Sequence, residues 1–388
     1  MVLRMSEVGE NMRAVGMVVE FNPFHNGHAY YVQQAKKQAA ADVTVAVMSG
    51  DFTQRGEPTV VDKWERTRAA LASGVDLVIE LPFFYACQPA HRFAAGALRL
   101  LSEMGVSAVA FGAEHPQWDF RSLVRAAKTF DQRDLKQYTE TYATQFNDQL
   151  MQATGVSLKE PNDILAFAYT KAAENHHYAF ELQPIKRRGS DYHDEQISGR
   201  IASASAIRQA MLTGNDYQET IPAEMLASLA AVKRVPTWEK LYPMLRNQLI
   251  QAPVEQLRQT YQMAEGLEYR MKEQAQRSLD FDHFIHGIKT KRYTYAHLIR
   301  LCLYTTLQVR EKELAEHVNQ PYLHILGFNR RGQAYLHQVK KQVNIPMFTK
   351  VGQDLRDGLC NLDYRAGKLY QTFTPVEQDL KHAPIILR

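Results

Sequence analysis

The stretch that decides the fold is residues 15–37, VGMVVEFNPFHNGHAYYVQQAKK. Its first five residues are apolar apart from one glycine, and a polar turn follows them. Two histidines, His25 and His28, then stand where a helical pattern starts. Because a strand that is apolar on both faces is typical of a parallel sheet covered by helices, the stretch predicts a buried strand that leads directly into a helix.

The same alternation of strand and helix continues through the first half of the chain. Mostly apolar runs alternate with amphipathic segments, and glycines stand just past several of the predicted helix ends, as helix termination favours. We therefore expect a doubly wound, Rossmann-like α/β domain with a parallel sheet. The expected strands are residues 14–19, 43–48, 77–81 and 107–112, and the expected helices between them are residues 27–40, 62–73 and 93–104.

The second half of the chain has a different character. From about residue 224 the helical period dominates, and the polar segment NDYQETIPAE, which contains Pro222, precedes this change. Near the end, YLHILGFN and NIPMFTK are candidate strands. We expect two domains, an α/β domain of residues 12–220 and a mainly α-helical domain of residues 221–388.

Composition and charge restrict the classes of function. The chain has 46 basic and 42 acidic residues, so its net charge of +4 neither requires nor excludes a nucleic-acid partner. Three cysteines without a CxxC pair indicate neither a disulfide framework nor a cysteine zinc site. The first residues do not resemble a signal peptide, and no apolar run is long enough to span a bilayer, so we expect a cytoplasmic protein without a membrane partner.

The histidine turn predicts a phosphate site. In a parallel α/β sheet, ligands bind where the strands end and the helices begin. His25 and His28 are three residues apart and share one face of the first helical turn, where free backbone N–H groups and the helix dipole favour an anion. Gly27 lets a ligand approach the backbone, and Asn22 with Pro23 forms a tight turn. Two alternatives remain: a pair of metal ligands, for which no third ligand stands nearby in a recognisable spacing, or two solvated histidines.

A second helix start, in IASASAIRQAM (residues 201–211), offers Ser203, Ser205 and Arg208. Two hydroxyls, backbone N–H groups and a guanidinium are suited to a triphosphate tail. The alternative is a serine N-cap and a surface arginine, which are common on any helix. Together with HNGH in an α/β domain, the order of the two motifs resembles that of the HxGH-type nucleotidylyltransferases.

Four longer stretches make the resemblance more specific. They are VVEFNPFHNGH, VMSGDFTQRGEPTVVDKWERTRAAL, VIELPFFYACQPAHRFAAGAL and AVAFGAEH, in this order. With them, residues 12–211 resemble the bacterial tRNA(Met) cytidine acetate ligase family, and KTKRYTYAHLIR (residues 289–300) extends the resemblance into the second domain.

The resemblance implies an ATP-dependent ligase. Such an enzyme joins acetate to ATP as acetyl-adenylate with release of pyrophosphate, and passes the acetyl group to N4 of the wobble cytidine in elongator tRNA(Met). The first domain would bind ATP and acetate, with a magnesium ion on the phosphates, and the protein would bind no metal of its own. By motif match, the catalytic residues would be His25, His28 and Arg208, and the ATP-binding residues Val18, Val19, Glu20, Phe21, Asn22, Pro23, Phe24, Asn26, Gly27, Tyr31, Gly112, Asn162, Arg188, Ser203 and Ser205.

The second domain would bind tRNA. Its basic run KTKRYTYAHLIR offers cations for phosphates and two tyrosines as stacking faces. The alternative for any such run is a solvated basic helix face. The expected phosphate contacts are Lys289, Lys291, Arg292 and Arg300.

Some points stay open at the level of the sequence. FNPF and LPFFYACQP could wall a small acetate pocket, or they could be core. A small-molecule adenylyltransferase of the same superfamily would share the histidine turn, but it would need no basic helical domain. A non-catalytic tRNA- or ribosome-binding protein would have no chemical need for His25, Gly27, His28 and Arg208 together.

Overall fold

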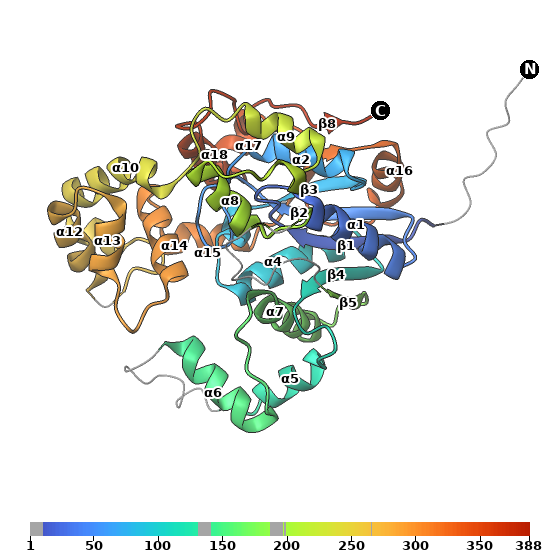
Figure 1. Ribbon diagram of the computed structural model, residues 1–388, viewed down its shortest axis with the longest axis horizontal. Coiled ribbons are helices and arrows are strands. Elements are labelled where there is room, and N and C mark those ends of the chain that lie inside the picture. Colours follow the sequence, from blue (N-terminus) through green and yellow to red (C-terminus); the bar gives the residue numbers. More distant parts are fainter. Residues whose placement is uncertain (1–10, 131–140, 187–196, 198, 265) are drawn as a thin grey trace, which may run out of the picture.

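The computed structural model describes residues 11–130, 141–186, 197, 199–264 and 266–388. Its strands form one sheet, which carries the fold (Figure 1). They are β1 (Ala14–Val19), β2 (Val43–Ser49), β3 (Leu77–Leu81), β4 (Ala108–Ala113), β5 (Glu181–Lys186), β6 (Leu323–Phe328), β7 (Met347–Phe348) and β8 (Ile385–Ile386). The order is β5-β4-β1-β2-β3-β6-β7, and β8 pairs with β6.

The predicted α/β fold is confirmed. The four expected strands correspond to β1 to β4 within one residue, and neighbours among β1 to β5 pair in parallel. Helices follow the strands as expected, since β1, β2 and β3 are completely or almost completely buried and need cover on both faces. The helices of this part are α1 (Asn26–Gln38), α2 (Lys63–Ala72), α3 (Phe83–Ala86), α4 (Ala90–Glu103), α5 (Phe120–Ala127), α6 (Tyr142–Thr154), α7 (Pro161–His176), α8 (Ala204–Thr213) and α9 (Ala223–Ala230).

A helical lobe follows α9 and lies to one side of the sheet (Figure 1). Its interior is apolar and aromatic, with Tyr242, Phe281 and Phe284 in mutual ring contact at 5.2–6.2 Å between centroids. The lobe helices are α10 (Trp238–Gln251), α11 (Val254–Arg258), α12 (Leu267–Arg277), α13 (Phe281–Ile288), α14 (Tyr295–Thr306) and α15 (Glu311–Val318).

The end of the chain differs from the expected division at residue 220. The candidate strand in YLHILGFN is β6, and it pairs antiparallel with β3, so the C-terminal segment belongs to the sheet of the first domain. The physical reason is that β6 is buried along its whole length and supplies partners to the open edge of β3. The helices α16 (Arg330–Val339), α17 (Gln353–Asp357) and α18 (Asn361–Tyr370) follow it. The helical lobe is thus an insertion between α9 and β6.

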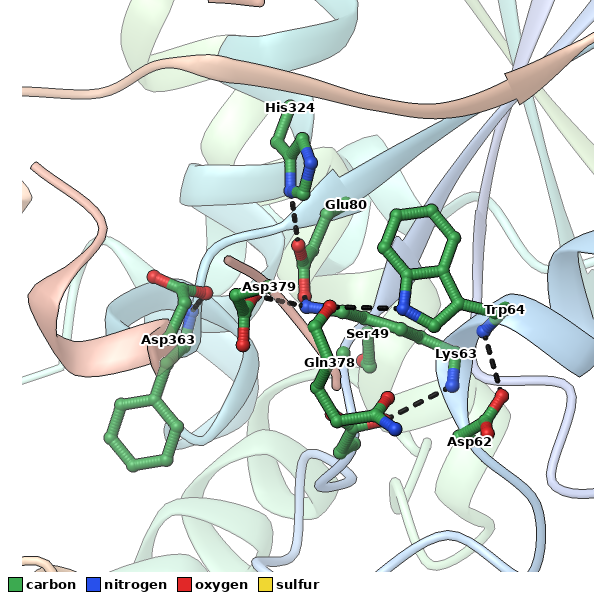
Figure 2. Close-up of polar contacts among 12 residues, drawn as sticks. Ser49, Asp62, Lys63, Trp64, Glu80, His324, Asp363, Gln378 and Asp379 are labelled. Carbon is green, nitrogen blue, oxygen red and sulfur yellow. Dashed lines mark hydrogen bonds and ion pairs between the residues drawn. The ribbon is translucent and has the colours of Figure 1, made fainter. Parts of the chain in front are cut away.

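A buried charge cluster attaches this C-terminal segment to the first domain (Figure 2). Lys63 Nζ, on α2, lies 2.7 Å from Glu80 Oε1 of β3 and 2.5 Å from Asp379 Oδ1 near the C-terminus. His324 Nδ1, on β6, lies 2.6 Å from Glu80 Oε2. Burial alone would lower the pKa of Lys63, but the carboxylates of Asp379 and Glu80 outweigh it and raise that pKa well above its ordinary value. Lys63 is therefore a permanent cation at the centre of the cluster.

Three of these side chains also satisfy the spacing of a metal site. Ligand atoms of Glu80, His324 and Asp379 all lie within 4.8 Å of one another. Since the ammonium of Lys63 already bridges both carboxylates, this position holds a protein cation and we assign no metal to it. None of the helices that the structure describes is both long and apolar enough to cross a membrane.

Removal of the central cation should destabilise the fold. Lys63→Met keeps the aliphatic stem but leaves Glu80 and Asp379 buried without their counter-charge, so we expect a loss of about 3–5 kcal/mol in the free energy of unfolding. Urea denaturation measures it. The control is Arg68→Met on the same helix, whose exposed pair with Glu65 at 3.7 Å is worth at most about 1 kcal/mol. Equal effects of the two substitutions would contradict the role of the cluster.

Candidate active site

The histidine turn lies at the carboxyl edge of β1, and the second motif lies beside it. Arg208 Nη1, on α8, donates to the carbonyl of Asn22 at 2.8 Å. The side-chain amide of Asn26 donates to the carbonyls of Arg200 and Glu219, at 2.8 and 2.9 Å. These contacts bring together two motifs that are about 180 residues apart in the chain.

His25 is the N-cap of α1 and its ring is held in one orientation. The residue is 5% exposed, and its Nδ1 accepts the backbone N–H of Gly27 at 3.1 Å. Because Nδ1 is the acceptor, the proton of the neutral ring is on Nε2, which is thereby a donor. The ring lies against that of His28, with 3.7 Å between centroids and 30° between planes.

The ring of His28 packs against two phenylalanine side chains. Its ring centroid lies 5.0 Å from that of Phe21 and 5.7 Å from that of Phe24, and both phenylalanines are buried. The alternative of two solvated histidines therefore does not describe this turn. The alternative that His25 and His28 are a pair of metal ligands gains no support either. Among the described residues, the side chains with the spacing of a metal site are Glu80, His324 and Asp379, in the cluster around Lys63.

Gly27 is needed for a reason that the sequence did not predict. A Cβ at this position would lie 2.8 Å from His25 Cε1 and 2.9 Å from His25 Nδ1. Any side chain would thus push the imidazole out of its place on the helix end. The absence of a side chain serves the ring of His25 at least as directly as the approach of a ligand.

The motif on α8 has two parts: a serine that caps the helix, and an arginine that is hydrogen-bonded to a second serine. Ser203 is the N-cap of α8, and its Oγ accepts the N–H of Ala206 at 3.1 Å, so the alternative of a capping serine describes this residue. Arg208 is half-buried, and its Nη2 donates to Ser205 Oγ at 3.2 Å. Arg208 is therefore no ordinary surface arginine.

The other residues of the turn mainly build its shape. Asn22 Oδ1 accepts the N–H of Val60 at 2.8 Å, and the hydroxyl of Tyr31 donates to the carbonyl of Ala110 in β4 at 2.7 Å. Val18 and Val19 are the last residues of β1, and Pro23 is buried. Phe21 and Phe24 are buried too, and the N–H groups of Gly27, His28 and Ala29 are bonded to His25. The turn therefore offers an anion mainly the imidazole of His25 and the positive end of the α1 dipole.

Glu20 is the carboxylate of the turn. Burial raises its pKa, although a hydrogen bond from Gln54 and the charges of Arg55, Arg208 and Arg66 oppose the rise. Its Oε1 accepts the backbone N–H of Gln54 at 2.6 Å. Glu20 thus joins the turn to the loop that follows β2.

Arg66 is a residue that sequence reasoning missed. It is fully buried on α2, and its guanidinium donates to the carbonyls of Glu20 at 2.8 Å, Ser49 at 2.9 Å and Val61 at 3.2 Å, and also to that of Gly50. One side chain therefore holds the ends of β1 and β2 together. Its position in a charged helical run carried no signal that could have separated it from a surface arginine.

The edge of β4 carries a polar network. Gly112 lies in β4, and Asn162 Nδ2 on α7 donates to Glu114 Oε1 at 2.5 Å. The carboxylate of Asp163 accepts the N–H groups of Glu114 and His115 and lies 2.6 Å from His115 Nδ1. Asp163 was not identified from the sequence as a candidate site residue. Its only signal in the sequence is that it is an acidic residue in the first turn of a predicted helix. Arg188 lies outside the described residues.

The basic run of the helical lobe is only partly at the surface. Lys289 and Lys291 are exposed, Arg292 is half-buried, and Tyr295 is 50% exposed. The expectation that Arg300 contacts a tRNA phosphate is corrected. Arg300 is 5% exposed, and its Nη1 donates to the carbonyl of Gln54 at 3.4 Å. Its guanidinium points into the protein, because α14 packs against the loop after β2, so it is not part of the surface that the basic run presents.

The expected aromatic walls of an acetate pocket belong to the core. Phe83, Phe84 and Tyr85 are at most 5% exposed and lie in one apolar cluster with the sheet. The packing alternative therefore describes LPFFYACQP, apart from its polar residue Gln88.

The chain is similar to characterised families over almost its whole length. A family model described as HIGH Nucleotidyl Transferase matches residues 12–383. A protein of Limosilactobacillus reuteri named tRNA(Met) cytidine acetate ligase is 66% identical over 376 residues, which cover 97% of this chain and 100% of that protein. A protein of the same name from Lactiplantibacillus plantarum is 46% identical over 96% of this chain and 98% of its own length.

Solved structures agree with these similarities. The crystal structure of apo TmcAL from Thermotoga maritima has a TM-score of 0.87 and 30% identity, and covers 97% of this chain and 100% of its own. The same protein bound with alpha-thio ATP has a TM-score of 0.85 and 29% identity, with the same coverage.

The clash at Gly27 generates a prediction about the turn. Gly27→Ala should displace the ring of His25 and weaken ATP binding about tenfold or more, because the loss of one hydrogen bond to a charged group is worth about 1.5–3 kcal/mol. Isothermal titration calorimetry measures the affinity. Gly352→Ala is the matched control, since a Cβ there meets no atom within 4 Å. Unchanged ATP affinity in Gly27→Ala would contradict the phosphate role of His25.

Proposed function

The chain belongs to the tRNA(Met) cytidine acetate ligases within the HIGH nucleotidyl transferase family, and we propose that it acetylates tRNA in two steps at the carboxyl edge of its sheet. It is an ATP-dependent ligase. In the first step acetate and ATP form acetyl-adenylate and pyrophosphate. In the second, the acetyl group passes to N4 of the wobble cytidine of elongator tRNA(Met). The observation that carries this proposal is the packed His25–His28 pair at the N-terminus of α1, with Arg208 bonded to the same turn.

The first step needs charge stabilisation more than a chemical group from the protein. A carboxylate oxygen of acetate attacks the α-phosphorus, the bond to the β-phosphate oxygen breaks, and pyrophosphate leaves with the electron pair. His25 Nε2–H and the positive end of the α1 dipole stabilise the phosphate oxygens, where negative charge builds up on the leaving group. Arg208 and Ser205 hold the β- and γ-phosphates, so positioning and electrostatics carry the step.

The histidine turn itself has few metal ligands, so the main ligands of a metal ion here would be the phosphate oxygens of ATP. Mg²⁺ in such sites usually keeps several waters and takes phosphate oxygens with one or two carboxylates. The one carboxylate of residues 18–31 is Glu20, and burial raises its pKa. We propose that a magnesium ion bound to the phosphate tail of ATP would supply charge neutralisation there, and that Glu20 is the residue of this motif that could help to hold it.

The second step requires the anticodon loop to reach the same edge. The N4 amine attacks the acetyl carbon, the bond to the adenylate oxygen breaks, AMP leaves, and the amine loses a proton. We propose that Lys289, Lys291 and Arg292 hold tRNA phosphates and that the exposed ring of Tyr295 stacks on a base. Residues 238–318 would then be the main tRNA-binding part. ATP and tRNA as substrates also favour the cytoplasm as the location.

One experiment tests the whole proposal. The purified protein is incubated with ATP, labelled acetate and total tRNA, and the tRNA is digested to nucleosides. We expect label in N4-acetylcytidine of elongator tRNA(Met) and in no other nucleoside. If no nucleoside gains label, and ATP releases pyrophosphate only when a phosphorylated vitamin or cofactor precursor replaces acetate, the protein is a small-molecule adenylyltransferase and the proposal is wrong.

The basic surface of the lobe gives a separate prediction. Lys291→Glu should weaken tRNA binding several-fold at physiological salt, because it removes a phosphate contact and adds a repulsive charge. Filter binding at several salt concentrations measures the effect, and the slope of affinity against salt should become shallower. Lys37→Glu carries the same charge change at the end of α1 remote from the histidine turn, and should bind tRNA as the wild type does. An identical affinity of both variants would remove Lys291 from the interface.

A further inference from the structure

Arg300 is a buried cation without a counter-ion. It is 5% exposed, and the described groups that act most strongly on its charge are Tyr304, Cys87, Tyr261 and Arg55, with no carboxylate among them. Its Nη1 makes a long hydrogen bond of 3.4 Å to Gln54, and its Nε has no hydrogen-bond partner in the described chain. Burial lowers the pKa of this guanidinium, which reflects the cost of holding the charge away from water. Since an uncompensated buried charge is strongly unfavourable, this position favours an anionic ligand.

A second buried donor belongs to the same group. Gln88, which follows α3, is 1% exposed and its Nε2 has no hydrogen-bond partner among the described residues. Arg92 Nη1 donates to the hydroxyl oxygen of Tyr261, so the hydroxyl proton is left for Gln88 Oε1 at 3.0 Å. The amide is thereby oriented with its nitrogen as the unused donor.

Gln54 connects the two donors with the nucleotide motif. Its carbonyl accepts from Arg300, and its side-chain nitrogen donates to the carbonyl of Gln88 at 2.5 Å. Its backbone N–H donates to Glu20, one residue past β1. Gln54 therefore links both residues with an unused donor to the turn that we assign to the phosphates.

The place of these donors relative to the strands of the sheet indicates which substrate they could bind. β1 has β4 on one side and β2 on the other. The loop with Gln54 follows β2, whereas Gly112 and Asn162, the expected nucleoside contacts, belong to β4 and α7. The donors thus lie on the β2 side of the phosphate turn, away from the nucleoside side, and a carboxylate held there has to reach the α-phosphorus in line with the departing pyrophosphate.

We propose that Arg300, Gln88 and Gln54 form the binding site for the carboxylate of acetate, an inference that rests on the proposed function. Arg300 Nε and Gln88 Nε2 donate to one carboxylate oxygen, and the other oxygen forms the new bond to phosphorus as pyrophosphate leaves. Buried Cys87, Tyr261 and Tyr304 surround the donors, and the hydroxyl of Tyr304 bonds the carbonyl of Cys87. Arg300, assigned to tRNA by the sequence, serves the small substrate instead.

The test uses acetate-dependent pyrophosphate exchange without tRNA. Arg300→Met should raise the KM for acetate tenfold or more and leave the KM for ATP within twofold, whereas Arg300→Lys should recover part of the affinity. Arg246→Met is the matched control. This half-buried arginine of the same lobe also donates to a backbone carbonyl, that of Ala275 at 2.8 Å, and it lies in no site, so its KM for acetate should equal that of the wild type.

A second variant separates binding from structural support. Gln88→Glu keeps the acceptor for Tyr261 and places a negative charge on the residue that Gln54 links to Arg300. The melting temperature should be equal to that of the wild type or higher, while the KM for acetate rises tenfold or more. A purely structural Arg300 would gain stability from this charge with no change in the KM for acetate, which would overturn the proposal.

The outcomes also distinguish a failure of the proposed acetate site from a failure of the proposed function. If the wild type shows no acetate-dependent exchange, the proposed function fails. If the wild type is active and both Arg300→Met and Gln88→Glu keep its KM for acetate, only the acetate site fails. A lower tRNA affinity of Arg300→Met with an unchanged KM for acetate would return Arg300 to the tRNA surface and overturn the inference.

Discussion

The buried guanidinium of Arg66 holds together the region on which the rest of the structure depends. Parallel strands end at the same edge of a sheet, but their last carbonyls and the first residues of the following loops have no regular partner there. Arg66 donates to the carbonyls of Glu20, Ser49 and Gly50 and thereby ties the end of β1 to the end of β2. The histidine turn and the loop after β2 consequently have defined places relative to each other. A charged group is suited to this position because its donors are numerous and planar and cannot lose their proton.

The turn above Arg66 is made rigid by contacts that use no ligand. His25 is oriented by the N–H of Gly27, His28 lies on Phe21 and Phe24, and Asn26 bonds two carbonyls near α8. Catalysis by electrostatic preorganisation needs donors that are already in place when charge develops on the phosphates. The chain accordingly uses several side chains of this motif as supports, which hold the two imidazoles at the positive end of the α1 dipole.

The helical lobe and the sheet domain meet at the loop after β2. Trp238 Nε1, on α10, donates to the carbonyl of Gly56 at 3.0 Å, and Arg300 on α14 donates to that of Gln54. Gly56 has a φ of 84°, and a Cβ there would lie 3.0 Å from the Cα of Arg300, so only glycine suits this close approach. The part of the protein to which we assign tRNA therefore contacts the loop to which we assign acetate.

The amino-acid sequence by itself determined the alternation of strands and helices, the place of the histidine turn and the class of activity. These features depend on periodicity and on motifs whose residues are neighbours in the chain, so local patterns are sufficient for them. The tertiary structure alone decided which charged residues are buried and what they contact. Lys63, Arg66 and Arg300 look like surface residues of amphipathic helices, yet each is at most 5% exposed. The physical reason is long-range packing: Arg300 meets Gln54 across 246 residues of chain, and Lys63 meets Asp379 across 316, distances over which no pattern in the sequence reports a contact.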